Sequence, residues 1–165
     1  MEIYLIRHGI AGDRQDYTQD EVRPLTHQGR AKTTQVAKRL AAIGLHFDLL
    51  YSSPLVRAQQ TAQILLQEGL SQELQTLLNL APGGSFLEGL ATLNTLKLTA
   101  TSKIALVGHQ PDLGQWAQAW IWGDVADKMV LKKAGIIGLT CREMPLAPAQ
   151  GEMFLLTSPR YFLNG

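Results

Sequence analysis

The chain has 165 residues, of which 45% are hydrophobic and 18% charged, and its net charge is +1. This composition predicts a single folded domain over residues 1–165 and excludes a disordered or low-complexity chain. The near-neutral charge argues against nucleic acids and anionic membranes as partners, because both are bound by strongly basic surfaces. The only cysteine, Cys141, can form no internal disulfide, and the apolar start lacks the features of a signal peptide, so we expect a cytoplasmic protein.

Strand-like and helix-like segments alternate from the beginning of the chain. The run from Glu2 to Arg7 is almost continuously apolar, as in a strand that is buried on both faces. Apolar residues at helical spacing then predict a helix from Gly29 to Leu45, with Thr26 as its N-cap. The apolar run from Phe47 to Ser52 predicts a second strand.

The middle of the chain continues this alternation. Ser53 and Pro54 are typical of a helix start, and that helix should extend to about Glu68. A weaker strand is expected from Leu74 to Leu80. After the break at residues 81–84, the pattern favours a helix from Phe86 to Leu98.

The last third of the chain contains the third clear strand, from Lys103 to Gly108. Pro111 opens a helix in which Trp116 and Trp120 share an apolar face, which is typical of core residues. Two final strands are expected from Ala134 to Arg142 and from Glu152 to Thr157, as antiparallel neighbours toward one side of the sheet. The whole pattern predicts an α/β fold, a three-layer α/β/α sandwich with a mostly parallel sheet.

Basic side chains follow each of the three clear strands. Arg7, His8 and Gly9 stand at the end of the first strand, Arg57 lies one turn into the helix after the second, and His109 follows the third. Parallel strands bring their carboxyl ends to one edge of the sheet, so these groups should meet there. A cation near a helix N-terminus is unfavourable by up to about 1 kcal/mol unless an anion lies close. The pattern therefore predicts an anion site.

Phosphate is the anion that suits this set of groups. Guanidinium groups pair with two phosphate oxygens at once, and backbone N–H groups at helix N-termini add further donors. Gly9 lacks a side chain and would let a ligand approach the backbone. An unprotonated imidazole can attack phosphorus and carry the phosphoryl group covalently. We therefore expect His8 to be the nucleophile, while Arg7, Arg57 and His109 hold the phosphoryl oxygens.

Metal binding by His8 and His109 is the chemical alternative. No third histidine or carboxylate pair accompanies them in the sequence, and the neighbouring arginines would repel a cation. We therefore expect no metal ion and no other cofactor. His27 and His46 stand at helix ends in polar surroundings, and we assign them no catalytic role.

Five segments in order carry a resemblance to a known family: Leu5 to Gly9, Arg23 to Thr26, Ser52 to Ala62, Leu80 to Gly84 and Val107 to Pro111. On these segments the chain resembles the histidine phosphatase superfamily, whose mark is Arg-His-Gly after the first strand. Within that superfamily it is similar to the phosphohistidine phosphatase (SixA) type. Arg-His-Gly alone is a weak signal, but five ordered segments over nearly the whole chain are specific.

The resemblance implies a phosphoglycerate mutase-like fold and a covalent phosphohistidine on His8. It also implies that Arg7, Arg57 and His109 complete the catalytic pocket and that Arg23 makes an additional phosphate or substrate contact. From the residues alone, Arg23 is equally compatible with a solvated loop position.

One departure from the family bears on the substrate. Many members carry a Glu or Asp as general acid after the middle of the chain, where this sequence has Asn79. Glu88, on the predicted helix that follows, is more typical of a solvated helix face. Hydrolysis of an alkyl phosphate ester needs a proton for its alkoxide leaving group. Phosphohistidine is less demanding, because its imidazole can leave neutral once solvent has protonated the ring.

Three functions remain open at this point. We favour a protein phosphohistidine phosphatase, acting as a monomer on the phosphotransfer domain of a signalling or sugar-transport relay. The second is a phosphatase of small phosphate esters, and the third is a non-catalytic phosphoprotein binder. Lys132 and Lys133 are by default a solvated charge pair, although they could also help to receive an acidic protein substrate.

Overall fold

The computed structural model describes residues 1–126 and 128–163. Its strands alternate with helices along the chain. The strands are β1 (Glu2–Arg7), β2 (Leu49–Ser52), β3 (Leu74–Thr76), β4 (Lys103–Gly108), β5 (Ile136–Cys141) and β6 (Gly151–Thr157). The α-helices are α1 (His27–Ala42), α2 (Val56–Gln67), α3 (Phe86–Asn94), α4 (Asp112–Trp122) and α5 (Arg160–Leu163), and the short 3-10 helices are η1 (Arg14–Asp16) and η2 (Leu78–Leu80).

The strands form one mixed sheet in the order β3-β2-β4-β1-β5-β6. The first four strands along the chain run parallel, whereas β5 pairs antiparallel with β1 and β6 pairs antiparallel with β5. This arrangement confirms the predicted mostly parallel sheet with antiparallel strands on one side. Its register sets Arg7 of β1 opposite Gly108 of β4, so the residues that follow these two strands emerge side by side.

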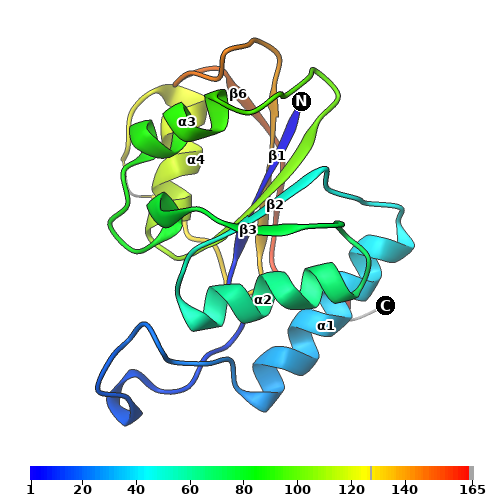
Figure 1. The fold of residues 1–165 in the computed structure, drawn as a ribbon, viewed down its shortest axis with the longest axis vertical. Helices are drawn as coiled ribbons and strands as arrows, with labels where there is room; N and C mark the ends of the chain where they lie inside the picture. The colour runs from blue at the N-terminus through cyan, green and yellow to red at the C-terminus, as the bar shows by residue number, and fades with distance from the viewer. Residues whose placement is uncertain (127, 164–165) are drawn as a thin grey trace.

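Helices cover both faces of the sheet, as Figure 1 shows, with α1 and α2 on one side and α3 and α4 on the other. Each face has its own buried apolar cluster. One cluster includes Val36 of α1 and Leu65 of α2, and the other includes Leu93 of α3 and Trp120 of α4. Burying two separate faces of one sheet is what defines the predicted three-layer sandwich, and that prediction is confirmed.

Several element boundaries differ from the prediction. Thr26 caps α1 as expected, because its hydroxyl accepts a hydrogen bond from the Gly29 amide, and the helix therefore begins at His27. The prediction of a helix start at Ser53 and Pro54 is wrong, since α2 begins at Val56. The Ser53 hydroxyl instead accepts the Leu55 amide in a turn before the helix and also contacts a histidine.

The remaining elements differ from the prediction mainly at their ends. The weak strand from Leu74 to Leu80 divides into β3 and the 3-10 turn η2, and the helix from Phe86 ends at Asn94. The final strands begin and end within two residues of their predicted bounds. Trp116 and Trp120 are buried as expected, and so is Cys141. Over the described residues, no helix has both the length and the apolar character that crossing a bilayer requires.

Candidate active site

The carboxyl ends of β1 and β4 bring two histidines together. His8 follows β1 and His109 follows β4, and their ring centroids lie 5.1 Å apart. Both residues are buried, with 5% and 3% of their surface exposed. The sequence prediction that these strand ends meet at one edge is therefore confirmed, and it rests on the register of two adjacent parallel strands.

The backbone fixes the tautomer of His8. Nδ1 of His8 lies 2.7 Å from the carbonyl oxygen of Gly9, which can only accept, so the ring proton must be on Nδ1. Nε2 then carries a lone pair, and it accepts a hydrogen bond of 3.3 Å from Nε of Arg57. The geometry thus exposes Nε2, and not Nδ1, to the cationic groups of the site.

The surroundings of His8 keep its ring neutral. The pKa of His8 is lowered to about 2, first by burial and then by the neighbouring His109, Arg57 and Arg7. The hydrogen bond with Gly9 opposes these effects without reversing them. A neutral imidazole at ordinary pH is the form that can act as a nucleophile toward phosphorus.

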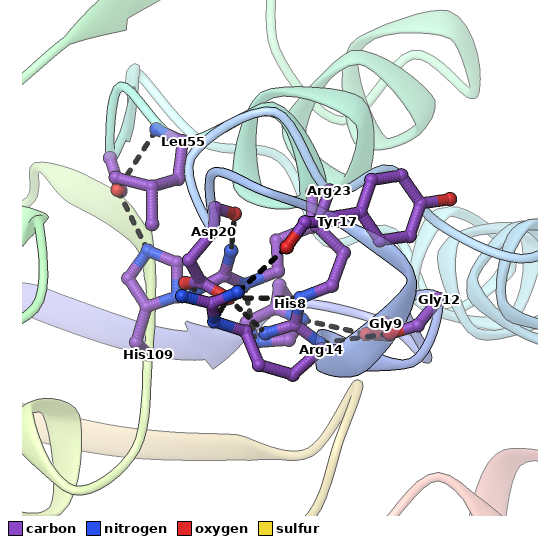
Figure 2. Close-up of polar contacts among 11 residues, drawn as sticks. His8, Gly9, Gly12, Arg14, Tyr17, Asp20, Arg23, Leu55 and His109 are labelled. Carbon is purple, nitrogen blue, oxygen red and sulfur yellow. Dashed lines mark hydrogen bonds and ion pairs between the residues drawn. The ribbon is translucent and has the colours of Figure 1, made fainter.

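His109 is held by Ser53, which the sequence analysis had interpreted as a helix cap. Its Nε2 lies 2.8 Å from the Ser53 hydroxyl, whereas its Nδ1 has no hydrogen-bond partner among the described residues. In Figure 2 that second ring nitrogen lies on the side of His109 toward His8. Burial lowers the pKa of His109 to about 3, with the charge of Arg57 as the next cause. The neutral ring therefore has one nitrogen fixed and one available.

Arg57 lies in the first turn of α2, with a side chain that is 4% exposed. Besides its contact with His8, it donates from Nη1 to the backbone oxygen of Asp20, at 2.8 Å, and from Nη2 to the Asp20 carboxylate, at 2.7 Å. Burial lowers the pKa of Arg57, but a guanidinium retains its charge at any ordinary pH. Within the chain, the Asp20 carboxylate is the anion that pairs with Arg57 near this helix start.

The Asp20 carboxylate binds several cations of one loop. Arg23 donates to it from Nε at 3.0 Å and lies within 2.8 Å through Nη2, while Nε of Arg14 lies at 3.4 Å. In Figure 2, Asp20 lies in the same cluster of side chains as Arg23 and the two histidines. Partial burial raises the pKa of Asp20, but hydrogen bonds from Arg23 and Arg57 lower it by more in total, so the carboxylate is ionised. Arg23 therefore belongs to the site and is not a solvated loop residue.

Arg7 and Gly9 are positioned by backbone contacts. Arg7 donates from Nη1 to the Leu131 carbonyl at 2.7 Å, and its buried Nε has no partner among the described residues. Gly9 was expected to give a ligand access to the backbone, but its amide already donates to the Thr61 hydroxyl at 3.0 Å. A Cβ at this position would lie 2.4 Å from the Thr33 hydroxyl oxygen. Glycine is therefore required here by helix packing.

The position that lacks a general acid is Asn79, at the centre of η2. Its amide nitrogen donates to the Glu88 carboxylate at 3.1 Å. Glu88 is exposed at the start of α3, as the sequence analysis expected for a solvated helix face. The side chains at positions 79 and 88 thus form one exposed polar pair.

The chemistry of the site follows from its charges. Arg7, Arg23 and Arg57 contribute three cations against the single carboxylate of Asp20, and two neutral histidines lie beside them. Such a site suits a tetrahedral dianion and a nitrogen nucleophile. In the described part of the chain, no group of three or more His, Cys, Asp or Glu side chains could hold a metal ion. His27 and His46 are both exposed.

Comparison with known proteins identifies the family. Residues 3–83, which include His8, Arg23 and Arg57, match the histidine phosphatase superfamily (branch 1). The chain belongs to the histidine phosphatase superfamily. It is also 48% identical to an uncharacterised protein of Picosynechococcus sp. over 99% of both chains. The mitochondrial serine/threonine-protein phosphatase Pgam5 of Drosophila persimilis is 44% identical over 40% of this chain, which matches 22% of that longer protein.

Solved structures share the fold over nearly the whole chain. The protein histidine phosphatase SixA, in a complex with tungstate, superposes with a TM-score of 0.84 at 24% identity, over 98% of this chain and 99% of that one. A chain described as a putative alpha-ribazole-5'-P phosphatase from Escherichia coli superposes with a TM-score of 0.74 at 20% identity, over 96% and 98%. These likenesses confirm the phosphoglycerate mutase-like fold of this histidine phosphatase.

Three residues of the site were missed by the sequence analysis: Asp20, Ser53 and Thr61. Asp20 lies in the long loop between β1 and α1, where no periodic pattern fixes the position of a side chain. Ser53 was noted, but as a helix cap. A pairing between Ser53 and His109 could have been suspected, because both follow adjacent parallel strands.

Proposed function

We propose that this protein is a phosphatase that hydrolyses phosphohistidine on proteins through a covalent phosphohistidine on Nε2 of His8. The observation that carries the proposal is the state of His8: a buried neutral ring whose Nδ1 proton is bound to Gly9 and whose Nε2 faces Arg57. A lone pair beside a guanidinium is suited to attack a phosphoryl group that the same guanidinium holds.

The first step transfers the phosphoryl group to the enzyme. Nε2 of His8 attacks phosphorus and forms a P–N bond, while the P–N bond to the substrate imidazole breaks in line with it. Arg7, Arg57 and the free Nδ1 side of His109 stabilise the phosphoryl oxygens. The substrate ring leaves as neutral imidazole when its other nitrogen carries a proton, so this step requires no acid from the enzyme.

The second step releases phosphate. A water molecule attacks the phosphorus, the bond to Nε2 of His8 breaks, and one water proton passes to a phosphoryl oxygen. His8 returns to its neutral state with the proton still on Nδ1, held by Gly9. The low pKa of His8 supports this step, because a ring that resists protonation at Nε2 is immediately ready for another cycle.

The choice of phosphohistidine over a phosphate ester rests on proton supply. Asp20 is the carboxylate that contacts the site arginines, and its lowered pKa makes it a poor proton donor. Asn79 replaces the acid that many family members carry, and its neighbour Glu88 is exposed. An alkoxide leaving group would lack a donor here, whereas imidazole needs none. The fold likeness to SixA supports the same choice.

Small phosphate esters are the competing substrates, since the fold is shared with alpha-ribazole and phosphoserine phosphatases. The test compares kcat/KM for a phosphotransfer protein phosphorylated on histidine with kcat/KM for a panel of sugar phosphates, nucleotides and phosphoserine. We expect the phosphohistidine protein to exceed every ester by at least about a hundredfold, as the contribution of a missing general acid would give. An ester with the higher kcat/KM would refute the proposal.

A further inference from the structure

A second group of basic side chains lies on a loop that contacts Arg7 and the backbone of His8. The Ala134 amide donates to the backbone oxygens of both residues, at 3.1 Å. The Leu131 carbonyl oxygen accepts a hydrogen bond from the Arg7 side chain. Between these two contacts lie Lys132 and Lys133. The loop that supports the phosphate pocket on this side therefore carries two consecutive lysines.

These lysines border a cavity of about 370 Å³. Its apolar lining includes Ile10, which follows the nucleophile by two residues, and Ala134. Lys32 of α1 also borders it, so that the three lysines come from two separate segments of the chain. Thr33, at the same cavity, has a buried hydroxyl without a hydrogen-bond partner among the described residues.

Among residues 1–126 and 128–163, no acidic side chain pairs with these three lysines. In the described residues, the ion pairs join other side chains, and no carboxylate lies within ion-pair distance of Lys32, Lys132 or Lys133. Burial lowers the pKa of Lys133, and the charges of Arg7 and Arg23 lower it further. Asp13 acts in the opposite direction but is the smallest of these influences. Positive charge thus accumulates here without a partner.

Two exposed apolar side chains stand next in sequence to residues that contact the site. Val130, next to the Leu131 carbonyl that holds Arg7, is 63% exposed, and Val22, between Asp20 and Arg23 in the loop, is 50% exposed. A protein surface lying over the phosphate pocket would cover them.

We propose that Lys32, Lys132 and Lys133 form a docking subsite for carboxylate side chains that flank the phosphorylated residue of an acidic protein substrate. The proposal rests on the proposed function for the protein nature of the substrate. Lysine ammonium groups on flexible stems suit several carboxylates without fixed geometry, unlike the arginine forks of the phosphate pocket. The subsite therefore selects the protein, while the arginines select the phosphoryl group.

The test measures the affinity of labelled peptides by fluorescence anisotropy. Each peptide carries a phosphonate analogue of phosphoserine or a hydrolysis-resistant analogue of phosphohistidine, flanked either by Asp and Glu or by Ser and Gln. The quantity of interest is the ratio of the two affinities, because effects on the phosphate pocket cancel in it. We expect acidic flanks to tighten binding at least about tenfold at low salt, and less at high salt.

Lysine variants assign that preference to the cavity. The triple substitution Lys32→Gln, Lys132→Gln and Lys133→Gln should reduce the ratio to about one, or Lys132→Gln alone should reduce it in part if the triple variant does not fold. The controls are Lys38→Gln, on the same helix as Lys32, and Lys97→Gln, beyond α3; both lysines are exposed and neither borders the cavity. Both controls should keep the wild-type ratio.

A wild-type ratio near one, or a ratio that the triple variant leaves unchanged, would overturn the subsite. The result is separable from the proposed function, because the preference for acidic flanks is expected on both analogues. If phosphohistidine proved not to be the preferred substrate in turnover, the phosphoserine analogue would still report whether the lysines recognise carboxylates.

Discussion

The Asp20 carboxylate lies 2.7 Å from Nη2 of Arg57, the same guanidinium whose Nε donates to Nε2 of His8. Asp20 therefore occupies donors that an incoming phosphoryl group needs. Its position on the loop between β1 and α1 allows it to be displaced without moving the sheet. In the proposed mechanism, phosphate binding would exchange one anion for another.

Replacing this carboxylate should strengthen anion binding. Asp20→Asn leaves a neutral side chain that hydrogen-bonds Arg57 less strongly and does not repel phosphate. We expect the inhibition constant of orthophosphate or tungstate to fall about three- to tenfold. Asp16→Asn, an exposed residue of the same loop, is the matched control and should change it little. Weaker anion binding in Asp20→Asn would mean instead that Asp20 holds the arginines in place.

Ser53 should be a positioning residue for His109. Ser53→Ala removes the hydroxyl 2.8 Å from Nε2 of His109 and leaves that ring free to rotate. The loss of one such hydrogen bond is worth about 1 kcal/mol, so kcat should fall about five- to tenfold, with a smaller change in KM. Restoring a hydroxyl with Ser53→Thr should recover part of the rate. Ser52→Ala is the control, because the Ser52 hydroxyl donates only to a backbone oxygen at 2.9 Å. Equal losses in both alanine variants would point to general destabilisation.

Asn79→Asp should create a proton donor. The new carboxyl group would stand beside Glu88, whose carboxylate lies 3.1 Å from the present amide nitrogen. Two carboxylates this close cannot both ionise easily, which raises the pKa of one of them. We expect kcat/KM for alkyl phosphate esters to rise about tenfold or more, with little change for phosphohistidine. Adding Glu88→Gln should abolish the gain, and a gain that persists would exclude a shared proton.

The two buried histidines should make stability depend on pH. The pKa of His8 is lowered to about 2 and that of His109 to about 3, whereas in an unfolded chain histidine titrates near its ordinary value of about 6.5. Below about pH 6.5 the unfolded chain thus binds more protons than the folded one. The free energy of unfolding should fall as the pH decreases toward 3, by up to about 1.4 kcal/mol per pH unit for each histidine.

Urea titrations between pH 7 and 5, in phosphate-free buffer, measure this dependence. The slope should be shallower in His8→Asn than in the wild-type protein, because one of the two histidines is gone. His46→Asn removes an exposed histidine and serves as the control. An unchanged slope in His8→Asn would show that the ring is not held neutral.

Sequence patterns predicted the strands and helices with strong periodicity. They also predicted the site residues that stand at the ends of those strands and helices. The apolar runs that became β1 and β4 fixed where His8 and His109 would meet, and Thr26 marked the start of α1. Arg57 followed from its place in the first turn of α2. In each case a local rule, such as strand burial, capping or the helix dipole, was enough.

What the sequence did not reveal depends on contacts between distant segments. Asp20 reaches Arg57 across 37 positions, and Ser53 reaches His109 across 56. The sequence suggested that Gly9 gives a ligand access to the backbone. The structure shows instead that Thr33 of α1 approaches so closely that only glycine fits at position 9. Local propensity carries no information about such pairs, because they form only when the sheet register and the helix positions are already set.

The proposed mechanism places the phosphoryl group on Nε2 of His8. The direct measurement mixes enzyme with a ³²P-phosphorylated histidine protein, quenches the reaction in alkali within milliseconds, and locates the label by mass spectrometry. We predict acid-labile, alkali-stable phosphate on His8, bonded to Nε2, which decays at the rate of phosphate release and is absent from His8→Asn but present in His46→Asn. Phosphate release at the full rate by His8→Asn, or a label on another residue, would contradict the account.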